Sequence, residues 1–195
     1  MSVAPVIVCP AQAARRVRWR NGAGWTREIM SWPSTEATGE SPSAASMWDW
    51  RISIADIECD GPFSSFAGIE RECLLLRGEG LRLQIEPGDA SALLPPFGRW
   101  RFDGEAATTA SLIDGRVEAL NLMWRRDRIR AASWHRPLVG TMVVFVDPDS
   151  RWLLHVLAGH AHVGDGDARV LLSAGDTACL GASEARTRHA LEGGG

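Results

Sequence analysis

The sequence of 195 residues contains no lysine, so all 21 of its basic residues are arginines. Every side-chain cation is therefore a planar fork that suits carboxylates, phosphates and aromatic faces. The formal net charge is -3, which gives the chain as a whole no electrostatic reason to bind nucleic acid or an anionic membrane. We therefore expect no nucleic-acid partner and no membrane partner.

Paired cysteines and long apolar runs are also missing. The four cysteines (Cys9, Cys59, Cys73 and Cys179) form no C-x-x-C pair, so neither a zinc ribbon nor a thioredoxin motif is indicated. No apolar stretch is long enough to span a bilayer, and the run at residues 6–8 is too short for a secretory signal. We expect a cytoplasmic protein with reduced thiols.

Short apolar or alternating runs bounded by Gly, Pro and Asp recur along the chain, whereas helical periodicity is weak. This pattern is typical of all-β sandwiches and barrels. The candidate strands are residues 17–19, 26–31, 50–57, 72–76, 81–86, 90–94, 117–124, 141–145, 153–157, 169–172 and 176–180. Residues 33–46 are rich in Ser, Thr, Ala, Glu and Gly and predict a mobile hairpin loop. The polar tail after the last strand is expected to be disordered.

One order of turns occurs twice in the sequence. An apolar strand ends at Gly78, another strand follows, and the turn Gly88-Asp89 precedes a third strand. Gly159 and the turn Gly175-Asp176 repeat this order in the second half of the chain. Glycine provides the positive φ that such tight turns need, and aspartate bonds the local backbone. The repetition indicates two duplicated β units.

Three blocks of the sequence resemble the HutD/Ves family of the cupin superfamily. They are residues 19–29 (WRNGAGWTREI), residues 50–71 with the segments WRISIA and DGPFSSFAGIER, and residues 121–126 (NLMWRR). The chain departs from the family at Ala23 and Ala67, where Gly and Pro are usual. It also has Ala119-Leu120 where the family often has Asp-Phe, which removes a polar group close to the expected binding site.

This resemblance implies an all-β bicupin, in which two cupin-like β-barrel or jelly-roll repeats pack into one compact unit over residues 1–195. The first repeat would cover about residues 17–125 and the second about residues 140–185. The resemblance also implies a role in histidine utilisation and a small acidic ligand related to formylated or formiminated glutamate. No established catalytic activity comes with the family, so we expect a ligand-binding sensor or regulator. The alternative is a metal-independent isomerase or hydrolase that acts on a related acyl amino acid.

Metal-binding cupins use a His-x-His pair, a Glu and a distant His, whose side chains converge inside the barrel. By position, Arg71 stands where such a cupin has its Glu, Arg101 stands where it has its last His, and residues 64–67 contain no His. We therefore expect no metal and no cofactor.

A second histidine-rich stretch comes after a glycine turn, outside the usual ligand positions. It contains His160, His162, Asp165, Asp167 and, further on, His189. A solvated strand is the favoured interpretation, because exposed polar residues on an antiparallel face are routine. A metalloenzyme that uses His160 and His162 is the alternative.

Alternation along two predicted strands assigns the candidate ligand-binding residues. Arg51 and Ser53 share a face of one strand, and Asn121, Met123 and Arg125 share a face of the other. If both faces look into the first barrel, arginine can bind a carboxylate in bidentate fashion and asparagine can recognise an amide or formyl group. The alternative is that both faces are solvated, with arginine covering apolar surface.

The candidate ligand-binding set is completed by Arg27, Arg71 and Arg101. No G-x-S-x-G elbow is present, and no catalytic residue can be named. The expected partner is a small acidic metabolite, and exposed edge strands would also allow a homodimer.

Overall fold

The computed structural model describes residues 6–19, 24–32 and 48–193. The chain divides into two compact units. The central unit is Arg15–Ser133, and the terminal unit combines Met1–Ala14 with Trp134–Gly195. The regular structure is almost entirely strand, which confirms the all-β prediction, and the fold is of the cupin type. The predicted loop at residues 33–46 lies outside the described residues.

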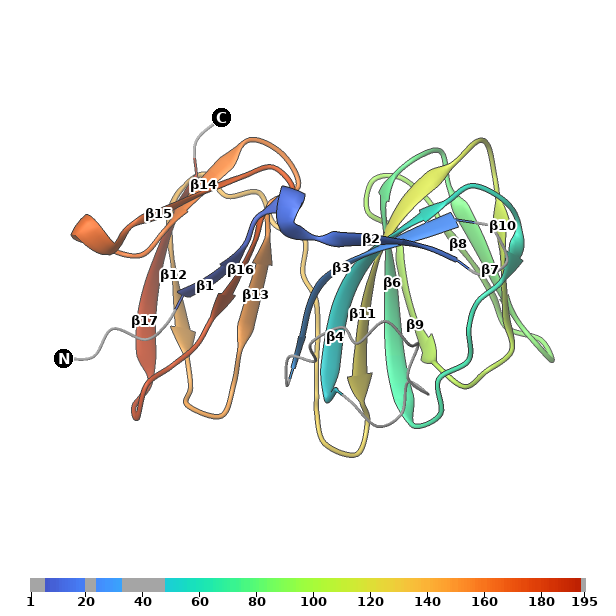
Figure 1. Ribbon diagram of the computed structural model, residues 1–195, viewed down its shortest axis with the longest axis horizontal. Helices are drawn as coiled ribbons and strands as arrows, with labels where there is room; N and C mark the ends of the chain where they lie inside the picture. The colour runs from blue at the N-terminus through green and yellow to red at the C-terminus, as the bar shows by residue number, and fades with distance from the viewer. Residues whose placement is uncertain (1–5, 20–23, 33–47, 194–195) are drawn as a thin grey trace. The chain divides into compact units, whose positions relative to one another are not determined.

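The central unit consists of two sheets. One has six antiparallel strands in the order β2-β3-β4-β11-β6-β9, and the other has four in the order β5-β10-β7-β8 (Figure 1). The bounds are β2 (Arg15–Arg18), β3 (Gly24–Trp32), β4 (Trp50–Ile57), β5 (Gly61–Pro62), β6 (Ile69–Arg77), β7 (Leu81–Ile85), β8 (Ala90–Leu93), β9 (Arg99–Asp103), β10 (Thr108–Leu112) and β11 (Val117–Arg125).

The two sheets of the central unit share one apolar core. Leu81 and Leu83 of the four-stranded sheet pack with Ala55, Cys73 and Ala119 of the six-stranded sheet. Because side chains alternate along a strand, these contacts define the face of the six-stranded sheet that looks into the core. We call this face the inner face and the opposite one the outer face.

Gly24, the first residue of β3, allows a close backbone approach to β4. A Cβ atom built on Gly24 would lie 2.2 Å from the carbonyl oxygen of Asp56, so β3 and β4 can approach only if this residue is glycine. Trp19 Nε1 donates a hydrogen bond to Thr26 Oγ1 at 2.7 Å, which ties β2 to β3. This hairpin places the next residues of β3 against the site described below.

The terminal unit also has two sheets, in the orders β1-β16-β13 and β12-β17-β14-β15. Helical residues among those described are limited to single 3₁₀ turns, and no described helix is long and apolar enough to cross a membrane. The bounds are β1 (Val6–Cys9), η1 (Ala11–Ala13), β12 (Gly140–Val146), β13 (Trp152–His155), β14 (His160–Val163), η3 (Gly166–Ala168), β15 (Val170–Ser173), β16 (Thr177–Leu180) and β17 (Thr187–Gly193).

The expectation of a disordered tail after residue 180 is wrong for the described residues. Strand β17 lies in the middle of its sheet, paired with both β12 and β14. His189 and Leu191 are buried, while Arg188 and Glu192 are exposed. Buried and exposed residues alternate along β17, as in any strand with one face in the core. The polar composition of the segment hides this pattern in the sequence.

The predicted turns occur, but the two copies of the pattern differ by one strand. Gly78 and Gly175 have φ of 103° and 92°, the left-handed region that favours glycine. Asp176 accepts a hydrogen bond from the backbone N–H of Ser173 at 2.8 Å, as expected of such a turn. In the terminal unit, both β14 and β15 lie between Gly159 and Gly175.

Two neighbouring leucines of β15 test the assignment of the terminal core. Leu172 is 0% exposed and Leu171 is 55% exposed. We expect Leu172→Ala to lower the free energy of unfolding by about 2–5 kcal/mol, because it removes buried methyl groups and leaves a cavity. Leu171→Ala should change it by less than about 0.5 kcal/mol. Chemical unfolding followed by circular dichroism checks this, and equal losses in both variants would contradict the assignment.

Candidate functional site

The cross-strand register brings the predicted residues of β4 and β11 together on the inner face. Asn121 pairs directly with Ser53, and Met123 pairs directly with Arg51. The same β11 residues pair on their other side with β6, so that Asn121 faces Cys73 and Met123 faces Arg71. Directly paired residues share a face, and Cys73 belongs to the core. These side chains therefore lie on the inner face.

Two parallel rows of side chains cross the inner face from β3 to β6. The arginine row is Ser31, Arg51, Met123 and Arg71, and the asparagine row beside it is Glu28, Ser53, Asn121 and Cys73. Apart from Arg51 and Glu28, which are partly exposed, every member of the two rows is buried. The rows combine two cations, one carboxylate and small polar groups in a largely dehydrated setting.

Arg71 lies at the centre of the most enclosed part of this face. Its side chain is held by Nη2, which donates to Asn121 Oδ1 at 2.9 Å, and by Nη1, which donates to the carbonyl oxygen of Ser64 at 3.1 Å. The guanidinium carbon also lies 4.9–5.6 Å from three phenylalanine ring centroids, where cation–π attraction is effective. The rings are Phe63, Phe66 and Phe102.

Arg71 has no carboxylate partner among the described residues. The residue is 6% exposed, and its Nε–H has no hydrogen-bond acceptor there. Burial lowers the pKa of Arg71 to about 10, with Cys73 acting in the opposite direction and Arg51 lowering it further. Arg71 is thus still a cation at neutral pH, and its burial without a counter-ion is costly.

Arg51, the second cation of the arginine row, has a partner. Its Nε lies 2.8 Å from Glu28 Oε2, close enough for an ion pair although the angle is poor for a hydrogen bond. Ser31 Oγ donates to the other oxygen of Glu28 at 3.5 Å. The Glu28 side chain is 41% exposed, so this pair is half solvated, in contrast to Arg71.

Arg125 lies at the end of the same face. It pairs with Ile69 of β6 and is the next residue after Met123 on the same face of β11. Its Nε lies 3.3 Å from Asp127 Oδ1, and its Nη2 donates to the second oxygen of that carboxylate at 3.5 Å. Hydrogen bonding to Arg125 lowers the pKa of the Asp127 carboxyl. Arg125 is therefore near the two rows but already neutralised.

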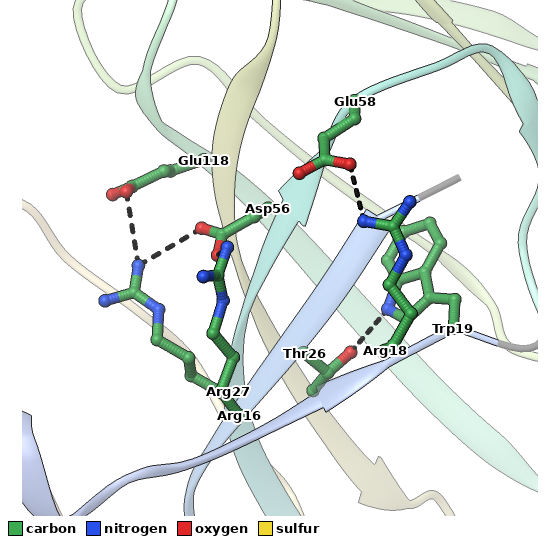
Figure 2. A network of polar contacts seen from close by, with 8 residues as sticks. All are labelled: Arg16, Arg18, Trp19, Thr26, Arg27, Asp56, Glu58 and Glu118. Carbon is green, nitrogen blue, oxygen red and sulfur yellow. Dashed lines mark hydrogen bonds and ion pairs between the residues drawn. The ribbon is translucent and has the colours of Figure 1, made fainter. Parts of the chain in front are cut away.

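Arg27 and Arg101, the other two predicted residues, lie on the outer face. Thr26 and Glu28 pair with the inner-face residues of β4, so Arg27 between them points outward. Figure 2 shows its Nη2 between Asp56 and Glu118, at 3.3 Å from an oxygen of each. The expectation that Arg27 joins the other candidates therefore does not hold.

Arg101 departs from the expectation for the same reason. It pairs with Glu72 of β6, an outer-face neighbour, and its Nη2 lies 3.3 Å from Glu72 Oε2. Its guanidinium carbon lies 4.9 Å from the Trp124 ring. Trp100 and Phe102 are the residues of β9 that face the core. Arg101 therefore does not point inward, contrary to what the comparison with the last histidine of metal cupins had led us to expect.

Three inner-face contributors were missed from the sequence. Glu28 was overlooked because a register shift between Glu28 and Met30 breaks the alternation of β3. Phe63 and Phe66 lie in the loop before β6, where the alternation of a strand cannot be used to predict which way a side chain points. All three belong to the recognised sequence blocks, which was the available signal.

The histidines of the terminal unit do not converge. His160 and His162 lie on β14 with ring centroids 5.9 Å apart, whereas His189 is buried and bonds the carbonyl oxygen of Gly181 at 2.8 Å. Asp165 pairs with Arg188 at 2.8 Å, and the side chain of Asp167 is outside the described part. Within residues 6–19, 24–32 and 48–193, no three His, Cys, Asp or Glu side chains form a group that could hold a metal.

Comparison with known proteins gives curated relatives over part of the chain. The uncharacterized 21.2 kDa protein in the hutC 3' region of Pseudomonas putida is 39% identical over 121 residues, which is 62% of this chain and 59% of that protein. Protein Ves of Citrobacter koseri is 39% identical over 115 residues, 58% of this chain and 54% of that protein. The chain thus matches little more than half the length of these relatives.

Solved structures match nearly the whole chain. The conserved protein of unknown function PA5104 from Pseudomonas aeruginosa PAO1 has a TM-score of 0.83 and 28% identity, covering 97% of this chain and 93% of that one. HutD from Pseudomonas fluorescens SBW25 has a TM-score of 0.66 and 25% identity, covering 97% and 94%. The HutD family model matches residues 11–195. The chain therefore belongs to the HutD family, within the cupin superfamily.

Proposed function

We propose that this protein binds a small organic acid with two carboxylates on the inner face of its central unit, without a metal ion. The observation that carries the proposal is Arg71, a buried cation with an unused Nε–H and no carboxylate partner among the described residues. A buried charge is destabilising unless it is paired. An anionic ligand would supply the missing charge and the missing acceptor.

The spacing of the arginine row supports a dicarboxylate. Arg51 and Arg71 lie on β4 and β6, which flank β11, so their backbones are about 10 Å apart from the usual spacing of strands. Met123 lies between them and is buried, packed in a cluster with Trp48 and Ile69. An acid with a carboxylate at each end and methylene groups between would place one charge at each arginine.

The asparagine row supports an acyl amino acid. Asn121 and Ser53 lie beside the gap between the two arginines, and both carry groups that donate and accept hydrogen bonds. Asn121 already accepts from Arg71 through Oδ1, which leaves its amide N–H groups to donate. They suit the carbonyl oxygen of a formyl group. N-formylglutamate and formiminoglutamate combine these features with two carboxylates.

The family and one relative support a place in histidine catabolism. The P. putida relative is named for its position beside hutC, and HutD of P. fluorescens shares the fold and 25% of the sequence. A protein that binds an acidic intermediate and has no named catalytic residue suits a sensor or regulator of the pathway. The inner face also suits a metal-free site, because its two arginines repel a cation.

A charge-removal series tests the proposal. We expect N-formylglutamate or formiminoglutamate to bind the wild-type protein and to raise its Tm. Arg71→Met should weaken that binding at least about 30-fold, because a buried charge-assisted contact is lost. Arg27→Met removes the same charge from the outer face of the same sheet and should change the affinity by less than about 3-fold.

Isothermal calorimetry and thermal unfolding measure both effects, and circular dichroism verifies that each variant is folded. Absence of binding by the wild-type protein at millimolar concentrations of both acids would refute the proposed ligand. Equal losses in Arg71→Met and Arg27→Met would refute the proposed site.

Catalysis on the same ligand is the second candidate, and Glu28 is the observation that favours it. This carboxylate lies on the inner face beside Arg51, where it could accept a proton from a bound acyl amino acid. A metal-independent isomerase or hydrolase would need such a base.

Turnover distinguishes the two functions. For the binding function we expect the ¹H NMR spectrum of N-formylglutamate or formiminoglutamate to stay unchanged during prolonged incubation with stoichiometric protein, although saturable line broadening shows binding. Appearance of product signals that require Glu28 would establish the enzyme instead.

A further inference from the structure

We propose that Glu28 is the specificity-determining residue of this site, and that it selects dicarboxylates that carry an N–H donor over those that lack one. The inference rests on the proposed function. Glu28 is the only carboxylate of the two rows, and its side chain is 41% exposed although it pairs with Arg51. Its position lets it act both as a competitor and as a partner of the ligand.

Glu28 competes with a ligand carboxylate for Arg51. The two side chains form an ion pair, with Arg51 Nε 2.8 Å from Glu28 Oε2. A dicarboxylate that uses both arginines must displace Glu28 from Arg51. Breaking this ion pair therefore lowers the affinity of every dicarboxylate by the same factor, whichever other groups the acid has.

The environment of Glu28 keeps the displaced carboxylate solvated and close to positive charge. Its side chain is 41% exposed, whereas that of Arg51 is 20% exposed. Glu28 also pairs across the sheet with Arg15 of β2, an exposed arginine on the same face. The carboxylate can thus leave Arg51 without becoming a buried, unpaired anion.

A displaced Glu28 becomes an acceptor beside the ligand. It lies in the asparagine row next to Ser53, which is itself next to Asn121. A ligand whose carboxylates lie on Arg51 and Arg71 would present its substituted nitrogen to this row. A formimino group is a cationic amidine and would gain a charge-assisted hydrogen bond from Glu28, whereas a formyl amide N–H would gain a neutral-donor one.

Three acids with the same carbon spacing isolate this effect. Glutarate has two carboxylates and no nitrogen, N-formylglutamate adds a neutral N–H, and formiminoglutamate adds a cation. We expect Glu28→Gln to bind glutarate about 10-fold more tightly, because Arg51 is released, and formiminoglutamate about 10-fold more weakly. N-formylglutamate should bind up to about 10-fold more tightly, because Arg51 is released for it as well and a glutamine carbonyl oxygen still accepts its N–H.

The matched control is Glu118→Gln, which makes the same change on the outer face, where Glu118 pairs with Arg27. It should leave the order and the affinities of the three acids within about 3-fold of the wild-type protein. Glu28→Ala is the second variant and should bind N-formylglutamate more weakly than Glu28→Gln does, because no side-chain acceptor remains. Calorimetric titration of each acid into each folded variant provides the affinities.

The outcomes separate this inference from the function on which it rests. If the wild-type protein binds the acids but Glu28→Gln leaves the ratio of formiminoglutamate to glutarate affinity unchanged, Glu28 is not the selector and the proposed function stands. If the wild-type protein binds none of the three, the proposed function fails and the inference fails with it. A tighter complex of Glu28→Gln with formiminoglutamate would also overturn the inference.

Discussion

The cost of burying Arg71 is the constraint on which the rest of the site depends. Arg71 is 6% exposed, and its guanidinium group must be stabilised without a carboxylate among the described residues. The protein does so with two carbonyl-type acceptors and three aromatic rings, which solvate the cation without neutralising it. An anionic ligand, as proposed above, would neutralise the cation and so link binding to stability.

The architecture of the central unit places a second arginine on the same face as Arg71. Antiparallel pairing sets Arg51, Met123 and Arg71 side by side, so the spacing of two charges follows from the spacing of strands. The four-stranded sheet supplies apolar packing for the far end of the inner face, where Ala55 and Ala119 lie. Ala119, where the resemblance to the family led us to expect a polar residue, is fully buried in this core.

On the outer face of the same sheet, arginines form ion pairs with carboxylates. Arg16 and Arg27 both reach Asp56, and Arg18 reaches Glu58 at 2.6 Å (Figure 2). Hydrogen bonding to Arg18 lowers the pKa of the Glu58 carboxyl. Every one of these cations has a carboxylate partner, in contrast to Arg71. The comparison distinguishes Arg71 from the arginines that are paired on the outer face.

The fold class was predictable because turn chemistry and alternation are local. Gly78 and Gly175 mark their turns from sequence alone, and alternation on β4 and β11 correctly grouped Arg51 with Ser53 and Asn121 with Met123. Strand register depends on residues far apart in the sequence, and it determines which face of the sheet each of the other candidate side chains lies on.

The faces of Arg27 and Arg101 depend on which residues of the neighbouring strand they oppose, and the shift after Glu28 cannot be read from a period of two. The strand β17 was missed because burial in the middle of a sheet outweighed its polar composition.

The central claim is that Arg71 is completed by a ligand carboxylate, and a crystal structure of the protein with N-formylglutamate tests it most directly. The account predicts a ligand carboxylate oxygen about 2.7–2.9 Å from Arg71 Nε, with the second carboxylate toward Arg51. A ligand bound elsewhere while Arg71 Nε keeps no anionic partner, or a carboxylate of the protein itself in that place, would contradict the account.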